Sequence, residues 1–169
     1  KSLDRAKSLL EICREKGTLP FAIAARHAFI SEALLRSAVF RGAINEDRLN
    51  SFKRTIRTKS GVMVEEYSAV CAGELDVTEF NKKYGHLRPG TYEITSLRYD
   101  EREDLFQSQA TIRPAAVEHS FSLTDEERAS LERLLKEAGL DLLSADQLLH
   151  HAATAIAARE DIKFEFTRV

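Results

Sequence analysis

The spacing of apolar residues along the chain predicts a largely helical protein. Apolar positions from Leu3 to Cys13 recur at helical intervals and predict a first amphipathic helix that stops at Gly17. A second, more apolar helix is expected from Thr18 to Phe40, with Pro20 tolerated in its opening turn. The chain therefore opens on two helices separated by a glycine.

Capping residues delimit the helices that follow. Asn45 caps a third helix that is expected to run unbroken to about Gly73. A short helix is expected from Asp76 to Tyr84, ending at Gly85. Two capping signals, Thr124 with Glu127 and Ser144 with Gln147, predict the last two helices, of which the first closes at Gly139 and the second runs through Arg159.

Four further segments lie outside these predicted helices. Residues 83–100 hold two glycines and a proline and predict one long ordered loop, which in a compact domain is usually functional. Residues 100–104 are expected to open a short helix that ends near Phe106. Residues 107–121 predict an extended or irregular stretch, and the alternating tail 163–169 predicts either a strand or a continuation of the last helix.

Composition adds limits on class and compartment. With 169 residues and 43% hydrophobic content, residues 1–169 predict a single mainly α domain of about five to six helices, one long functional loop and a short extended segment. The net charge of -2 argues against nucleic-acid and membrane partners. Cys13 and Cys71 lie in apolar helical surroundings and predict free buried thiols, and so a cytoplasmic setting. We find no signal peptide and no apolar run of the roughly 20 residues that a membrane span needs.

The loop carries the candidate chemistry. Its two guanidinium groups suit a carboxylate or phosphate, its imidazole suits proton transfer, and its phenols suit the walls of a polar site. The candidate residues are His86 and Arg88 as catalytic groups, and Tyr84, Tyr92, Arg98 and Tyr99 as substrate-binding groups. Two alternatives stay open: the cations only complement a helix C-terminus, and the tyrosines only anchor the loop to the core. No metal-ligand spacing and no phosphate-binding glycine loop is found.

Two strings of sequence support a family resemblance. The first string is residues 80–94, followed by Arg-Tyr-Asp-Glu at 98–101, and the second is the ending Lys-Phe-Glu-Phe-Thr-Arg at 163–168. In these strings the chain resembles the middle segment of the phosphoenolpyruvate synthase and pyruvate phosphate dikinase-like phosphotransferases. The glutamine kinase-like branch is the most similar part of that group, and rifampicin phosphotransferases are more distant. The resemblance covers about the C-terminal half in motif. Leu97 stands where these relatives often carry proline.

The resemblance implies a multidomain enzyme of which this chain is an excised part. In that family an ATP-grasp domain uses ATP and Mg²⁺, a swivelling domain carries a phosphorylated histidine, and ATP yields AMP and phosphate. The chain would be the acceptor-binding middle domain, with no cofactor of its own, a small polar acceptor as ligand, and no activity alone. His86 and Arg88 would contact the acceptor or the phosphoryl group, Arg98 and Tyr92 less directly, while Gly90 and Thr91 would shape the loop.

A second hypothesis belongs to a different class of protein. The chain would be a helical interaction or regulatory module whose tyrosine-rich loop docks a partner protein without small-molecule chemistry. The two hypotheses differ in what Arg88→Ala and His86→Ala would change: turnover in the first, complex formation in the second.

Overall fold

A computed structural model of the protein describes residues 2–89, 93, 95–106 and 120–168. Across these ranges the chain is mainly helical and no strand is found, which confirms the mainly α class. The helices are α1 (Ser2–Cys13), α2 (Leu19–Phe40), α3 (Glu46–Arg54), α4 (Lys59–Cys71), α5 (Val77–Tyr84), α6 (Asp125–Glu137) and α7 (Ala145–Phe166). A π-turn η1 (Arg14–Thr18) joins α1 to α2, so that six separate helices are described, and η2 (Tyr99–Glu101) is a single 3₁₀ turn.

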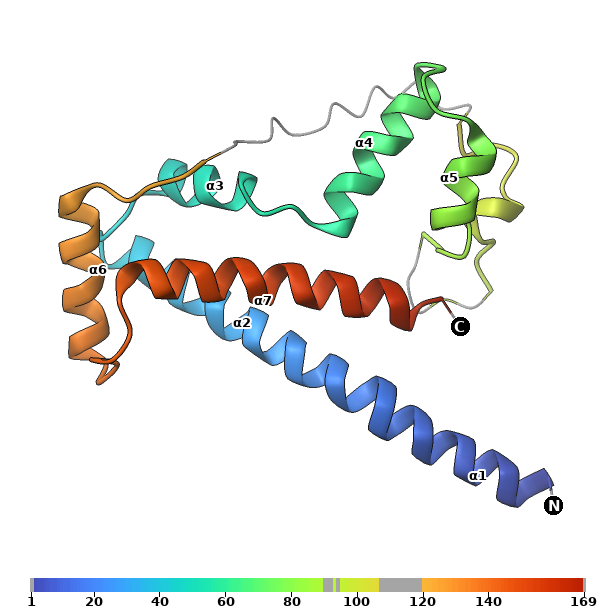
Figure 1. The fold of residues 1–169 in the computed structure, drawn as a ribbon, viewed down its shortest axis with the longest axis horizontal. Coiled ribbons are helices and arrows are strands. Elements are labelled where there is room, and N and C mark those ends of the chain that lie inside the picture. The colour runs from blue at the N-terminus through green and yellow to red at the C-terminus, as the bar shows by residue number, and fades with distance from the viewer. Residues whose placement is uncertain (1, 90–92, 94, 107–119, 169) are drawn as a thin grey trace.

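Helices α2 and α7 lie side by side and form the long axis of the body (Figure 1). Helix α6 packs across one end of this pair, while α4, α5 and η2 gather around the C-terminal end of α7. Most of the predicted extended segment, residues 107–119, lies outside the described residues, and Phe121 just after it is not helical. The candidate loop therefore lies at the end of α7 that is remote from α6.

The prediction that the first helix stops at Gly17 is wrong. The chain stays helical through the π-turn, in which the Leu19 N–H donates to the carbonyl of Arg14, five residues back. Pro20 follows directly and has no N–H to donate, so the wider turn comes where the regular hydrogen-bond ladder would be interrupted. A Cβ on Gly17 would come within 3.1 Å of the Phe166 ring at the end of α7, so this glycine also allows a close helix approach.

The predicted third helix is in fact two helices, α3 and α4. The Thr55 hydroxyl donates to the Phe52 carbonyl at 2.7 Å, and the Thr58 hydroxyl caps α4 by accepting the Gly61 N–H at 3.1 Å. Side-chain hydroxyls that bond to nearby backbone groups compete with the helical ladder, and here they end one helix and start the next. The break lets α4 begin beside the later turns of α7 and then run away from α3 toward α5 (Figure 1).

The predicted caps of the later helices are confirmed. Both capping boxes are present, with the Thr124 hydroxyl accepting the Glu127 N–H and the Ser144 hydroxyl accepting the Gln147 N–H. Gly139 ends α6 in the left-handed region at φ 72°. Of the two alternatives for the tail, the helical one holds, because α7 continues to Phe166. The helix expected after Asp100 is wrong beyond the single turn η2, because the backbone at Arg102 is extended.

Two apolar clusters lie at opposite ends of α7. The first joins α2, α3, α6 and α7, and includes Leu35, Leu49, Phe52, Leu131 and Leu149. The second is smaller and aromatic, and consists of Phe80, Tyr84 and Val70 with the half-buried Tyr67, Tyr99, Phe106 and Phe164 against them. Because the second cluster contains residues from both ends of the candidate loop, it holds that loop against α4, α5 and α7.

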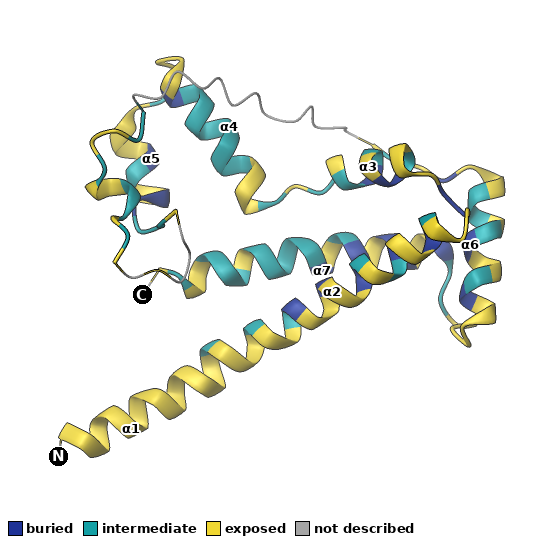
Figure 2. Cartoon of the chain, turned by 180° about the vertical axis from the view of Figure 1, so that it is seen from behind, coloured by how far each residue is buried: buried dark blue, intermediate teal, exposed yellow. Residues whose placement is uncertain are grey.

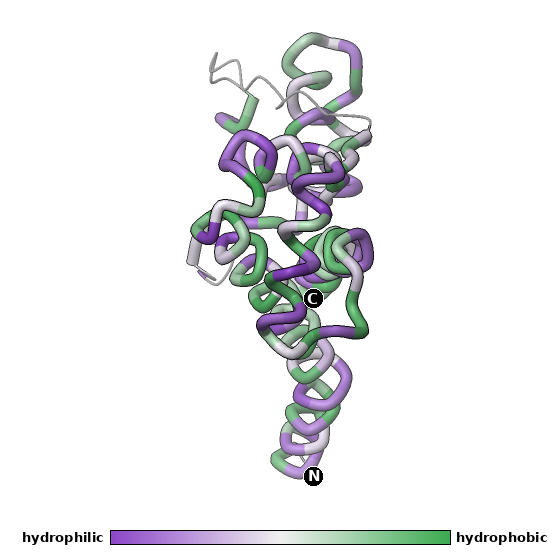
Figure 3. The backbone as a smooth tube through the Cα atoms, turned by 90° about the vertical axis from the view of Figure 1, so that its left-hand side faces the viewer, coloured by the Kyte–Doolittle hydropathy of each residue, from purple (hydrophilic) through white to green (hydrophobic). Residues whose placement is uncertain are grey.

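Helix α1 projects beyond the body, and none of its residues is buried (Figure 2). Apolar and polar residues nevertheless alternate along it to the N-terminal end (Figure 3). Its Cys13 is exposed, as is Cys71 at the end of α4, so the prediction of buried thiols is wrong although both cysteines are free. The apolar neighbours that predicted burial of Cys13 lie on a helix that nothing in the described chain covers. The cytoplasmic location stays a prediction.

Leu10→Ala is expected to change the free energy of unfolding by less than about 0.5 kcal/mol, because exposed positions contribute little to stability. The Leu10 side chain is 72% exposed, and alanine preserves helix propensity. Urea unfolding of the variant beside the parent chain measures the change. A loss above about 1 kcal/mol would show that α1 packs against another surface in solution.

Among the described residues, no helix is both long enough and apolar enough to cross a bilayer.

Candidate functional site

Backbone hydrogen bonds bring the two ends of the candidate loop together. The Tyr99 N–H donates to the Leu87 carbonyl at 2.8 Å, and the Asp100 N–H donates to the Gly85 carbonyl at 3.2 Å. Gly85 is required at this crossing, because a Cβ there would come within 2.9 Å of the Asp100 side chain. The loop therefore leaves α5 and returns at η2 through one narrow neck.

Acidic residues of η2 hold the two predicted arginines. The Arg98 guanidinium pairs with Asp100 at 2.5 Å, and Glu101 accepts the Arg98 backbone N–H at 2.8 Å. Arg88 donates to the Ser96 carbonyl within the loop and lies 3.9 Å from the Glu101 carboxylate. The two guanidiniums therefore have separate partners among the described residues, and only Arg88 lines the pocket described next.

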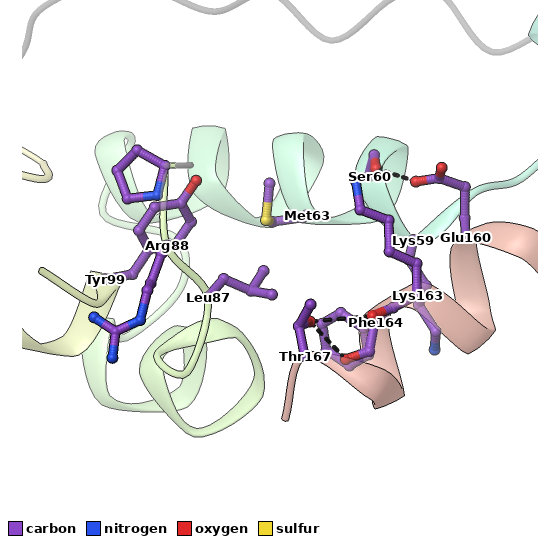
Figure 4. Close-up of a pocket in the computed structure, with 11 residues that line it drawn as sticks. Lys59, Ser60, Met63, Leu87, Arg88, Tyr99, Glu160, Lys163, Phe164 and Thr167 are labelled. Carbon is purple, nitrogen blue, oxygen red and sulfur yellow. Dashed lines mark hydrogen bonds between the residues drawn. The ribbon is translucent and has the colours of Figure 1, made fainter. Parts of the chain in front are cut away.

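A pocket of about 190 Å³ lies between the loop, α4 and α7 (Figure 4). The loop supplies Leu87, Arg88 and Pro89, and η2 supplies Tyr99. The other walls come from the first turns of α4 and the last turns of α7, and they consist of Lys59, Ser60, Met63, Glu160, Lys163, Phe164 and Thr167. Two stretches more than 60 residues apart, the loop and the 163–168 string, thus meet in one cavity.

The pocket has an apolar middle and cationic ends. Leu87, Met63 and Phe164 lie between Arg88 on one side and the lysines on the other (Figure 4). One carboxylate, Glu160, also lines it, and this group accepts hydrogen bonds from Ser60 at 2.6 Å and from Arg159 at 2.9 Å. Since three cations face a single occupied carboxylate, the pocket favours an anionic or strongly polar ligand.

His86 lies at the edge of the aromatic cluster. Its ring packs edge-on against Phe164, with centroids 4.9 Å apart, and its Nε2 is buried without a hydrogen-bond partner among the described residues. Burial lowers the pKa of the imidazole, and the nearby guanidiniums of Arg168 and Arg98 lower it further, while the backbone of Phe164 acts in the opposite direction. The lowered pKa favours the neutral form of the imidazole, and His86 itself is not among the residues that line the pocket.

The lowered pKa of His86 has a consequence for stability. Below about pH 6.5 the unfolded chain binds a proton at this residue that the folded chain resists, so folding is expected to weaken as pH falls through that window. Between pH 7.5 and 5.5 the parent chain is expected to lose more stability than His86→Gln. Urea unfolding at each pH measures the difference. The exposed His150 supplies the control substitution, and a parent-like pH profile for His86→Gln would contradict the assignment.

The predicted tyrosines fall in different places. Tyr99 lines the pocket, whereas Tyr84 is buried between Phe80 and Phe164 and does not. Burial and the neighbouring Glu66 carboxylate raise the pKa of Tyr84 to about 12, which keeps its phenol protonated. Tyr92, together with Gly90 and Thr91, lies outside the described residues. The substrate-binding roles of all three tyrosines stay predictions.

Sequence reasoning missed the lysines of the pocket. The sequence pattern does not single out Lys59, and Lys163 appears there only as the first residue of the 163–168 string. That string did contain a usable signal, because Lys163, Phe164 and Thr167 recur at helical spacing and share one face of α7. Lys59 gave no such signal, since its place in the pocket depends on the break before α4.

No three His, Cys, Asp or Glu side chains of the described ranges come together as metal ligands. Comparison with protein-family models, with curated proteins and with solved structures finds no match for this chain.

Proposed function

We propose that this chain is the acceptor-binding middle domain of a dikinase-type phosphotransferase similar to phosphoenolpyruvate synthase. It would work with an ATP-grasp domain, which uses ATP and Mg²⁺, and with a phosphohistidine domain, and it would not be catalytic alone. One observation carries the proposal: the loop and the 163–168 string, which together suggested the family, line the same pocket. A common binding role predicts that these two separate strings meet at one cavity, whereas helix capping would not require them to meet.

The chemistry of the pocket suits transfer of a phosphoryl group to a polar acceptor. Phosphoryl transfer needs fixed positive charge around oxygens that become more negative, and Arg88 offers such a charge at the pocket edge. A neutral imidazole accepts a proton from an acceptor group, which is the role we assign to His86. The Tyr99 side chain lines the same cavity and would orient the acceptor. A glutamine-like amide is the acceptor we favour, from the most similar branch.

Arg88→Gln is expected to weaken acceptor binding about tenfold, the effect of losing one charge-assisted hydrogen bond. Titration of the ¹⁵N-labelled chain with glutamine and related amides measures it, and we expect shifts at Leu87, Tyr99 and residues 163–167. Arg102→Gln is the matched control: the Arg102 side chain is also 29% exposed and ion-paired, but with Asp104 and outside the pocket.

Turnover tests the reaction itself. When the chain is supplied with the ATP-grasp and phosphohistidine domains, acceptor-dependent formation of AMP is expected to fall sharply in Arg88→Gln and in His86→Gln but not in Arg102→Gln. Unchanged turnover with loss of the complex between the domains would instead support a docking module. No AMP formation with any amide acceptor would remove the proposed acceptor class.

A further inference from the structure

Two ammonium groups at one end of the pocket have no counter-ion in the described chain. Lys59 begins α4, Lys163 lies in the last turn of α7, and both line the cavity. No carboxylate among the described residues lies within ion-pair distance of either Nζ, although most exposed cations nearby are paired. The carboxylate that shares their wall, Glu160, is already bound to Ser60 and Arg159.

The surroundings strengthen the positive potential at this end. The Lys59 ammonium lies 5.6 Å from the centre of the Phe164 ring, which holds it over the apolar floor of the pocket. Helix α4 begins at the same wall, and Thr58 caps only the Gly61 N–H of its first turn. The positive end of the helix dipole therefore adds to the two ammonium charges.

We infer that this end of the pocket binds the dianionic group of a phosphate monoester, whose organic body lies on the apolar floor of Met63, Leu87 and Phe164. One dianion neutralises the charges of two ammonium groups that line one pocket, whereas a carboxylate would leave one of the charges without a partner. Lysine binds phosphate as a point charge and needs no bidentate geometry. The inference deepens the proposed function and rests on its pocket, but it does not depend on the reaction.

Phenyl phosphate and benzoate are the probes that test it, because they share a ring and differ in the charge of the anionic group. The ¹⁵N-labelled chain is titrated with each at pH 7.5 and constant ionic strength. Phenyl phosphate is expected to shift the amides of residues 59–63 and 163–167 and to bind at least tenfold more tightly than benzoate. Lowering the pH to 5 removes most of the second phosphate charge and is expected to weaken phenyl phosphate alone.

Charge-removing variants connect the binding to the two lysines. Lys59→Gln and Lys163→Gln are each expected to weaken phenyl phosphate about tenfold, the effect of one charged contact. Lys136→Gln, on the exposed face of α6 and outside the pocket, is expected to bind as the parent does. Preserved shifts elsewhere in the spectra show that each variant remains folded.

The inference is overturned if benzoate binds as tightly as phenyl phosphate, if neither binds, or if a double variant that combines Lys59→Gln with Lys163→Gln keeps the parent affinity. Its failure differs from failure of the proposed function. If phenyl phosphate binds at the lysines but glutamine causes no chemical-shift change near Arg88, the inference is kept and the proposed amide acceptor is rejected. Binding of glutamine at Arg88 without any binding of phenyl phosphate would do the reverse.

Discussion

Phe80→Ala is expected to lower the free energy of unfolding by about 3–5 kcal/mol, the usual result of emptying an aromatic site in a core. Phe80 is 1% exposed and is among the largest fully buried side chains of the described chain. Its ring centre lies 4.8 Å from that of Tyr84 and 5.4 Å from that of Phe106. The cluster is small, and its aromatic members have few neighbours that can move into the space.

Urea unfolding followed by circular dichroism measures the loss. Phe40→Ala is the matched control, because that ring is 90% exposed and its removal is expected to cost less than about 0.5 kcal/mol. A second effect is expected in the site, since Tyr99 packs against the same cluster and would shift in NMR spectra. Similar losses for the two variants would mean that the aromatic cluster does not form in solution.

Gly85→Ala is expected to destabilise the chain by about 1–3 kcal/mol, the range for adding a methyl group to a site without space. The new Cβ would lie 2.9 Å from Asp100 and 2.5 Å from the Asn81 carbonyl. The backbone would have to move at one of these two contacts. The hydrogen bond from the Asp100 N–H to the Gly85 carbonyl, at 3.2 Å, is longer than the one from the Gly85 N–H to the Asn81 carbonyl, at 2.8 Å, and is expected to break first. The neck of the loop is therefore expected to open, with loss of the hydrogen bond from the Asp100 N–H to the Gly85 carbonyl.

Gly61→Ala is the control for this change. Gly61 lies in the first turn of α4, where the nearest atom to a new Cβ is the Thr58 hydroxyl oxygen at 3.4 Å, an ordinary contact. Alanine there is expected to gain up to about 1 kcal/mol from helix propensity. Thermal unfolding of both variants gives the comparison, and the amide shifts of residues 85–88 and 98–101 report on the neck. Stabilisation by Gly85→Ala would contradict the close approach.

Local signals in the sequence were sufficient for most helix ends. Asn45, Asp76, Thr124 and Ser144 each accept a backbone N–H two or three residues ahead, and these bonds form within one turn of chain. The two helix boundaries that were predicted wrongly depend on local hydrogen bonds that compete with, or widen, the regular helical ladder. Thr55 and Thr58 end one helix and begin another, while Gly17 lies in a π-turn that carries the helix past a glycine.

The sequence also concentrated the candidate chemistry in residues 84–99, and its neighbourhood in space contains the pocket. It did not separate the roles of similar side chains. Arg88 lines the cavity whereas Arg98 is paired with Asp100, and Tyr99 lines it whereas Tyr84 is in the core. Residues of one type differ here because the loop turns at its neck, and the direction of each side chain after that turn depends on packing against α5 and α7.

By itself, the sequence determined the helical class, most of the caps and the position of the loop, because each of these follows from hydrogen bonds and apolar spacing within a few residues. Only the tertiary structure decided which residues share the pocket. Lys59 reaches it because α4 turns away from α3, and Lys163 because α7 continues to Phe166. Such neighbours are fixed by packing between segments about 100 residues apart, which no local pattern encodes.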